Sequence, residues 1–498
     1  MRHIIDRNDN FRRKRKLNVL SHLGCDKVFD YFEKICDIPH GSFHEKALSD
    51  YIVSFAKERG LYCRQDNKMN VLIKKGGTAG YESSPVLIMQ GHIDMVCDKN
   101  EDTEHDFLTE PLEIYIDGDD IKARGTTLGA DNGIAAAYML ALLDAEDIAH
   151  PPLECIFTVE EEIGMGGATD FDAFDLEGKR FLNMDTEEEG HLMVSCCGGR
   201  RMRVYLPIEK EKKQAGTTLS VHIRGLKGGH SGSDIHLQRA SANVLLGRFL
   251  FELRERVDFA LVSANGGNMD NAICREAEAV VVVAPEQVQT VAAVIEEAEA
   301  MFREEYKDRE SDILMTAEQM PEAAEVLTTE TRDYVIALLR LLPYGVQTMD
   351  TNMDGLVETS SNIGILKTNE DHIFIDNAVR GSMESRKDAI CKKIEVLGSL
   401  CGAKVVGVHD YPGWQYNPNS EMLRIFKEVW VEKFGEEPKV VAIHAGLECG
   451  LFAKKIPGLD LISLGPNMYD VHTPDERLSI SSTIRIWEYL KLVLARLK

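Results

Sequence analysis

The chain has 498 residues, more than one ordinary hydrophobic core accommodates, so we expect at least two domains. Its formal net charge of −25 argues against a nucleic-acid partner, because phosphate binding requires clustered cations. No apolar stretch is long enough to cross a membrane. Eleven cysteines without CxxC pairs indicate a reducing compartment rather than a disulfide framework, and we expect a cytosolic protein.

The first part of the chain alternates between helical and strand patterns. Residues 1–17 contain five consecutive basic residues but no apolar signal core, so we expect a disordered basic extension, with a basic targeting tail as the alternative. Helical spacing follows over 27–38, 45–58 and 133–145, and strand patterns lie at 71–73, 86–90 and 154–159. Ser42 is a candidate cap for the second helix. This alternation, over 18–197, predicts an α/β fold with a mostly parallel sheet and helices on both faces.

The pattern changes after the paired cysteines and glycines at 196–199. Half-buried strands, two long helical stretches and a further strand-rich region follow, which indicates an α+β domain. The α/β pattern returns near residue 410 and continues to a C-terminal amphipathic helix. We therefore predict one domain made of 18–197 and 410–498, interrupted by an inserted lid or dimerisation domain over 198–409.

Histidine or acidic residues directly follow four of the apolar runs in the predicted α/β domain. His92 and Asp94 follow 86–89, Glu160 to Glu162 follow 155–159, Asp185 follows 181–184, and His472 follows 461–464 after a Gly-Pro loop. In open α/β sheets, ligand-binding groups gather at the carboxyl ends of the strands. Four such ends carrying His, Asp or Glu predict a metal site.

Each of these groups has a plain alternative. Asp94 lies two residues after His92 on an extended segment, so it can accept a hydrogen bond from that ring, but an HxD pair alone is weak evidence. Asp131 precedes a helix and could simply cap it, or it could be a carboxylate held between two metals. Three successive glutamates, 160–162, repel one another unless cations compensate, and one that binds no metal could act as a general base.

A charge count favours two metal ions. Three ligand carboxylates, from Asp131, Glu162 and Asp185, together with one hydroxide match the charge of two divalent cations. His92 and His472 would bind as neutral imidazoles. Nitrogen and oxygen ligands without a thiolate fit zinc best, and Mn²⁺ or Co²⁺ could substitute. We expect two Zn²⁺ per chain.

Six segments resemble one known family, and the resemblance extends from residue 17 to 498. They are GHIDM (91–95), LGADNG (128–133), VEEEIG (159–164), NMDTEEEG (183–190), GLKGGHSG (225–232) and VHTPDE (471–476). Together they are similar to the aminoacyl-histidine dipeptidases, also called Xaa-His or carnosine-type dipeptidases. These belong to the zinc-peptidase-like, co-catalytic dizinc metallopeptidases.

The resemblance implies a role for each metal-site residue. His92 and Asp185 would hold one zinc, Glu162 and His472 the other, and Asp131 would bridge both. Glu161 would be the general base, and Asp94 would orient His92. The family has aspartate where this chain has Glu160, and Gly164 sets the register that selects Glu161 and Glu162. A cis peptide after Asp131 is also implied.

The resemblance also implies four substrate-binding residues, three of which lie in the predicted insert. His230 would stabilise the tetrahedral oxyanion, and Asn271 would contact the substrate backbone. Arg380 would pair with the substrate carboxylate, and Gly446 would line the same pocket with its backbone. Without the resemblance, the glycines around His230 could only form a turn, and a single arginine in a strand is usually a surface residue.

The implied function is a cytosolic dizinc dipeptidase that hydrolyses unblocked dipeptides, histidine-containing ones among them. The expected partners are small peptide substrates and a second copy of the chain in a homodimer, with no nucleic acid and no membrane. An aminoacylase or a carboxypeptidase would share the metal core, and an aminoacylase would prefer N-acylated substrates. A non-catalytic binding protein of the same fold is the alternative from another class, against which the intact set of ligands argues.

Overall fold

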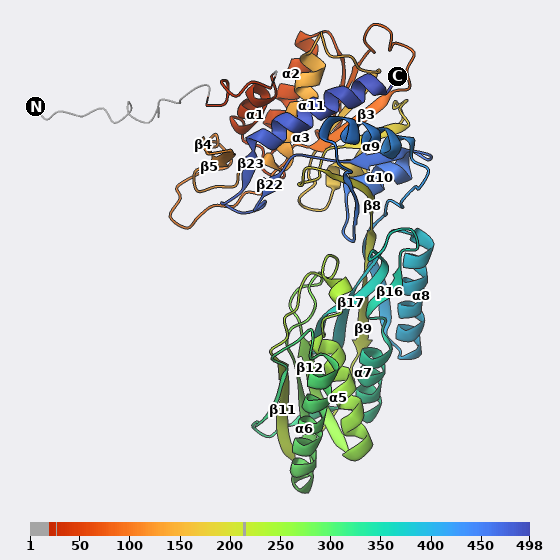
Figure 1. The fold of residues 1–498 in the computed structure, drawn as a ribbon. Coiled ribbons are helices and arrows are strands. Elements are labelled where there is room, and N and C mark those ends of the chain that lie inside the picture. Colours follow the sequence, from red (N-terminus) through yellow and green to blue (C-terminus); the bar gives the residue numbers. More distant parts are fainter. Residues whose placement is uncertain (1–18, 26, 213–215) are drawn as a thin grey trace, which may run out of the picture. The chain divides into compact units, whose positions relative to one another are not determined.

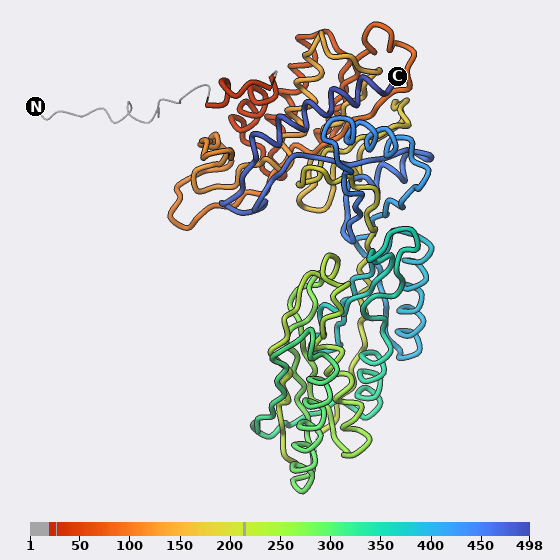
Figure 2. Tube along the Cα trace, in the orientation of Figure 1, coloured from red at the N-terminus to blue at the C-terminus, as the bar shows by residue number. Residues whose placement is uncertain are grey.

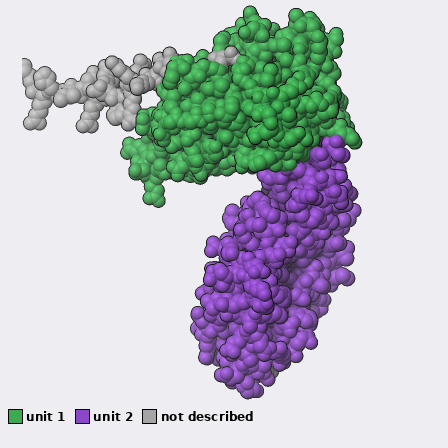
Figure 3. Space-filling model, viewed as in Figure 1, with its two compact units in different colours: residues 1–194, 419–441, 455–498 green, residues 195–418, 442–454 purple. Residues whose placement is uncertain are grey.

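The computed structural model describes residues 19–25, 27–212 and 216–498 (Figure 1). The expected basic extension, 1–17, lies outside the described residues. The chain divides into two compact units, coloured separately in Figure 3: the first contains residues up to 194 with 419–441 and 455–498, and the second contains 195–418 and 442–454. The second unit therefore includes the segments 195–197, 410–418 and 442–454, which our prediction assigns to the first domain.

The first unit is built on an eight-stranded sheet in the order β1-β2-β6-β3-β7-β21-β8-β20. The strands are β1 (Tyr62–Gln65), β2 (Val71–Lys75), β3 (Leu87–His92), β6 (Leu153–Thr158), β7 (Arg180–Asn183), β8 (His191–Cys196), β20 (Lys439–Ile443) and β21 (Asp460–Ser463). The neighbours β6, β3, β7 and β21 pair in parallel, whereas β1, β2 and β8 pair antiparallel. The predicted parallel sheet is thus confirmed at its centre, where β3 and β6 are buried throughout.

Helices pack on this sheet and on one another. They are α1 (Val28–Cys36), α2 (Lys46–Glu58), α3 (Ala130–Asp144), α4 (Gly166–Asp170), α9 (Glu421–Phe434) and α11 (Ile480–Arg496). The predicted helix after residue 133 is α3, which is apolar all round because neighbours enclose it. On it packs α11, at the blue end of the trace in Figure 2, where the Tyr138 and Trp487 rings stack 5.8 Å apart.

A small antiparallel sheet joins distant parts of the first unit. Its order is β22-β23-β5-β4, with β4 (Ile114–Asp117), β5 (Asp120–Ala123), β22 (Met468–Tyr469) and β23 (Arg477–Ser479). The turn between β22 and β23 carries His472. Pairing of β23 with β5 therefore fixes the segment that presents this histidine.

The second unit has the α+β character predicted for the insert. Its nine-stranded sheet consists of β9 (Gly198–Pro207), β11 (Thr217–Arg224), β12 (Phe259–Gly266), β13 (Ala277–Val283), β14 (Leu314–Gln319), β16 (Gly345–Met349), β17 (Val357–Thr368), β18 (His372–Gly381) and β19 (Lys404–Tyr411). The helices α5 (Ala242–Arg256), α6 (Val288–Glu305), α7 (Thr329–Leu341) and α8 (Glu384–Leu400) share one apolar core with this sheet. A short pair, β10 (Lys210–Lys212) with β15 (Glu325–Leu327), and the helix α10 (Glu448–Lys455) complete the assignment. Among the described residues, no helix has both the length and the apolarity to cross a membrane.

Candidate metal centre

The five predicted metal ligands lie together in the first unit. His92 ends β3, Asp131 lies in the first turn of α3, Glu162 follows β6, Asp185 follows β7, and His472 lies between β22 and β23. Their ligand atoms form overlapping groups in which all atoms lie within 4.8 Å of one another. Within the described residues, every group of three or more potential metal ligands belongs to this cluster.

Asp131 is shared between two of these groups. Its Oδ1 lies 3.1 Å from Nε2 of His92, and its Oδ2 lies 3.2 Å from Nε2 of His472. On one side, Asp185 Oδ1 is 3.5 Å from Nε2 of His92. On the other, Glu162 is 3.0 Å from Nε2 of His472. The two oxygens of the Asp131 carboxylate therefore face two separate pairs of potential metal ligands.

The three successive glutamates point to different partners. Glu161 and Glu162 form a group of potential ligands with His92. Glu160 instead ion-pairs with Lys68, whose Nζ lies 2.7 Å from its Oε2. Glu160 also has a left-handed backbone (φ +54°), which marks a tight turn at this point of the chain. The register inferred from Gly164 matches this arrangement, because the first glutamate is the one that turns away.

The electrostatics of the cluster favour positive charge. Hydrogen bonds with Asp131 and Glu162 raise the pKa of His472 to about 11. Burial raises the pKa of both Glu162 and Asp185, whereas hydrogen bonds with the two histidines outweigh burial and lower the pKa of Asp131. Carboxylates held this close need compensating cations. Because the donors are oxygens and imidazole nitrogens without a thiolate, the residues present fit two divalent ions.

Asp94 organises this cluster in two ways. His92 Nδ1 lies 3.0 Å from the backbone oxygen of Asp94, which can only accept, so this nitrogen carries the proton and leaves Nε2 for a metal. The Asp94 carboxylate is 3.4 Å from the same nitrogen. It also accepts the amide of Glu161 at 3.0 Å and that of Glu162 at 3.2 Å. The sequence predicts that Asp94 orients His92, but it does not predict that Asp94 also binds the amides of Glu161 and Glu162.

The predicted helix cap at Ser42 is wrong. The N-cap of α2 is Glu45, and no side chain caps it. The Ser42 hydroxyl donates instead to Oδ2 of Asp94 at 2.9 Å. A tertiary partner therefore takes the hydroxyl that a local capping rule would assign to the helix. This hydrogen bond connects the loop before α2 to Asp94, which contacts the candidate ligand His92.

Capping of α3 by Asp131 is likewise wrong. Glu476 accepts hydrogen bonds from the four amides of residues 128–131, at 2.7, 3.0, 2.8 and 3.3 Å in chain order. The side chain of Asn132 donates to Oδ1 of Asp185 at 2.7 Å. Sequence reasoning missed both residues, although both lie inside recognised motifs. The implied cis peptide between Asp131 and Asn132 is confirmed.

The four residues predicted to contact substrate belong to the second unit. His230 and Asn271 are brought together, because a β-bridge joins His230 to Ala272 and the Ser231 amide donates to the Asn271 oxygen at 2.8 Å. Gly446 lies in the turn before α10.

Arg380 lies on β18 and is buried rather than exposed, with 4% of its surface accessible. Its Nη1 donates to the hydroxyl of Tyr411, 3.1 Å away, a partner that sequence reasoning missed.

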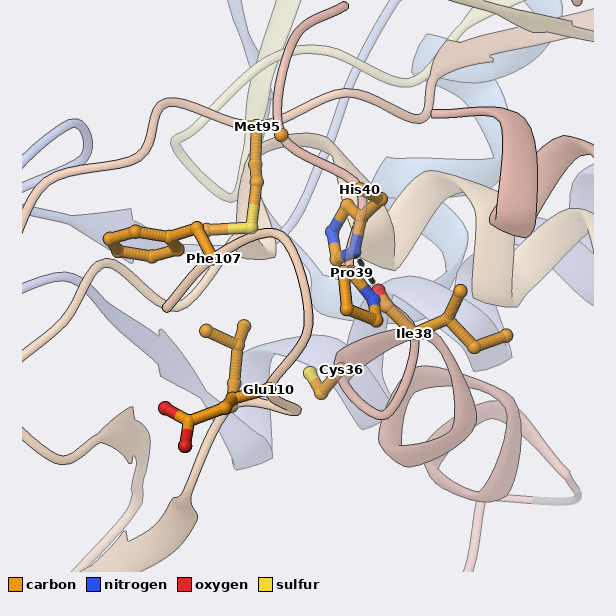
Figure 4. A pocket seen from close by; sticks show the side chains of 9 residues that line it. Cys36, Ile38, Pro39, His40, Met95, Phe107 and Glu110 are labelled. Carbon is orange, nitrogen blue, oxygen red and sulfur yellow. Dashed lines mark hydrogen bonds between the residues drawn. The ribbon is translucent and has the colours of Figure 1, made fainter. Parts of the chain in front are cut away.

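A small pocket also lies near the cluster of candidate metal ligands but is not part of it. Its lining includes His40, Met95 and Phe107 (Figure 4). The buried His40 donates through Nδ1 to the backbone oxygen of Ile38 at 2.6 Å, and burial lowers its pKa. None of the predicted ligands lines this pocket, so the candidate site is the carboxylate and histidine cluster.

Comparison with known proteins identifies the family of the chain. Residues 88–496 match the model of peptidase family M20/M25/M40, so the chain belongs to this family. The cytosol non-specific dipeptidase of Escherichia coli (strain K12) is 40% identical over 475 residues, which cover 95% of this chain and 98% of that protein.

Solved structures extend the comparison. The crystal structure of aminoacylhistidine dipeptidase from Vibrio alginolyticus matches with a TM-score of 0.91 and 39% identity, over 94% of this chain and 96% of that one. The aminopeptidase PepT from Bacillus cereus shares the fold, with a TM-score of 0.55 and 14% identity over 95% and 99% of the two chains. The predicted resemblance and fold class are confirmed.

Proposed function

We propose that this chain is a metal-dependent dipeptidase that hydrolyses the peptide bond of unblocked dipeptides, Xaa-His among them. The similarity to two dipeptidases at 39–40% identity, over nearly the whole of each chain, supports the substrate class. The observation that carries the proposal is the position of Asp131 between two sets of donors, with the carboxylate of Glu161 nearby.

Two divalent cations fit the residues present. His92 and Asp185 would hold one, Glu162 and His472 the other, and Asp131 would contact both. Zn²⁺ is the expected ion, with Mn²⁺ or Co²⁺ as substitutes. When bound, such a pair supplies an activated water and a positive charge that polarises the scissile carbonyl.

Glu161 is proposed as the general base. Its carboxylate would take the proton of the attacking water and pass it to the nitrogen of the leaving amine. The hydrogen bond from its amide to Asp94 fixes the start of its side chain. Through its backbone oxygen, Asp94 would also hold His92 in the tautomer that ligates metal.

The second unit would supply the substrate-binding groups. His230 would stabilise the oxyanion of the tetrahedral intermediate, Asn271 would contact the peptide backbone, and Gly446 would line the pocket. Arg380 would pair with the free C-terminal carboxylate, which would limit substrates to two residues. We propose the first unit as the catalytic domain and the second as the lid and dimerisation domain of a cytosolic homodimer.

The proposal is tested with purified protein loaded with Zn²⁺ or Mn²⁺ and three matched sets of substrates. Free dipeptides should be hydrolysed, whereas their N-acetylated forms and tripeptides should be hydrolysed much more slowly. A preference for the acetylated set would identify an aminoacylase, and efficient cleavage of longer peptides would identify a carboxypeptidase. Absence of turnover with every set, despite two bound metals, would identify a non-catalytic binding protein.

The role of Glu161 is tested separately. Glu161→Ala should lower kcat by at least about 100-fold, because a positioned general base contributes that much or more. Metal content should stay near two ions per chain. Unchanged turnover would refute the assignment of the base while leaving the substrate class intact.

A further inference from the structure

A buried carboxylate from the C-terminal part of the chain binds the loop that carries Asp131. Glu476 is 2% exposed. Its Oε2 accepts the amides of Leu128 and Gly129, and its Oε1 accepts those of Ala130 and Asp131. One side chain thus binds four consecutive amides more than 340 residues away in sequence.

The backbone of this loop is shaped to receive an anion. Gly129 has a left-handed conformation (φ +68°), which turns successive amides toward one point. A Cβ atom at this position would lie 2.9 Å from the sulfur of Met95 and 3.2 Å from Nε2 of His40, so any other residue would require the Met95 side chain to shift. Asp131 and Asn132 depart from helical dihedral angles, so the ordinary α3 ladder does not hold Asp131 in place.

Glu476 also connects two members of the same ligand group. It follows His472 by four residues and directly precedes β23, which pairing with β5 fixes in place. His472 and Asp131 both belong to the group completed by Glu162. A displacement of Glu476 would therefore change the distance between two ligands that must meet at one ion.

We propose that Glu476 is a positioning residue that holds Asp131 and His472 at the spacing required by the cation they share with Glu162. The inference rests on the proposed metal centre. Glutamine at this position would be similar in size but would lose the charge and direct an NH₂ group at backbone donors. Substitution of a residue that orients metal ligands typically weakens metal binding by about 10- to 100-fold. We expect a loss in that range for one of the two ions.

The experiment compares Glu476→Gln with a matched control, Glu154→Gln. Glu154 is also 2% exposed, and its carboxylate accepts the amides of Glu177 and Gly178 at 3.0–3.1 Å. It lies on β6 outside the ligand groups. Metal-free proteins are titrated with Zn²⁺ in competition with a chromogenic chelator, and urea unfolding of the same samples measures stability.

Glu154→Gln should bind each of two Zn²⁺ with the same affinity as wild type. Glu476→Gln should bind one of the two ions about 10- to 100-fold more weakly than wild type does. Two unchanged affinities in Glu476→Gln overturn the inference, and so does an equal loss in the control. If Glu476→Gln does not fold, Glu476→Asp decides: it keeps the charge but reaches fewer amides, so a selective loss is expected and wild-type affinities overturn the inference. Wild-type protein binding fewer than two ions would instead refute the metal centre itself.

Discussion

Replacement of Asp94 by alanine tests how strongly one buried carboxylate organises the candidate centre. Asp94 is 1% exposed and accepts the Ser42 hydroxyl and the amides of Glu161 and Glu162. A hydrogen bond to a charged group contributes about 1.5–3 kcal/mol, so three would sum to roughly 5–9 kcal/mol. Such contributions are not additive, and water can fill the space left by the carboxylate. We therefore expect Asp94→Ala to lower the free energy of unfolding by about 3–5 kcal/mol.

The same change should lower kcat, because the Glu161 amide loses its anchor and a displacement of about 1 Å costs roughly 100-fold. Urea unfolding of metal-free protein and kcat at saturating Zn²⁺ measure the two effects. Ser42→Ala is the control: it removes one donor but leaves the carboxylate and both amides, so we expect a loss of about 1.5 kcal/mol in the free energy of unfolding and less than about 5-fold in kcat. Equal effects of the two variants would refute the assigned role of Asp94.

Three further changes test other parts of the structure. Asp144→Asn should destabilise the protein by about 1–2 kcal/mol at pH 7. Hydrogen bonds from Lys27 and Arg59 outweigh burial and hold the Asp144 pKa at about 2. The gap between this pKa and that of the unfolded chain is worth at most about 2.4 kcal/mol. This advantage is fully present above the unfolded pKa of 3.8 and is lost as pH falls through about 2, so the stability difference between wild type and variant should shrink to less than about 0.5 kcal/mol at pH 2. Glu160→Gln should keep kcat within about 5-fold, since Glu160 pairs with Lys68 rather than with the ligand groups, and a drop near 100-fold would contradict this arrangement. Gly129→Ala should cost about 1–2 kcal/mol in urea unfolding because of its positive φ, and an unchanged midpoint would argue against a strained loop.

Part of the site could be predicted from sequence because three of its candidate ligands lie at strand ends. A buried strand is a local signal, and the polar residue that follows it is identified by position alone. His92, Asp185 and Glu162 were found in this way because β3, β7 and β6 are neighbours in the sheet. The same signal could not reach Glu476, since its four partners lie on a distant loop and its own neighbours resemble an ordinary polar turn.

The Ser42 prediction shows why local rules fail near such a centre. Serine before an amphipathic helix is a good cap when nothing else competes for its hydroxyl. Here a buried, ionised carboxylate competes, and a hydrogen bond to a charged acceptor is stronger than one to a backbone amide. The carboxylate belongs to a strand end 52 residues away, which only the tertiary fold brings into reach.

The three successive glutamates show how a correct premise can need a structural correction. Their mutual repulsion predicts compensating cations and makes the charge of the whole run an argument for metals. The structure divides that charge: Lys68 neutralises Glu160, and only Glu161 and Glu162 remain beside His92. Two divalent ions still balance the carboxylates of Glu162, Asp131 and Asp185 and one hydroxide, because Glu160 is not among these groups. An acidic run is therefore evidence for a metal only after the nearest basic side chains have been assigned.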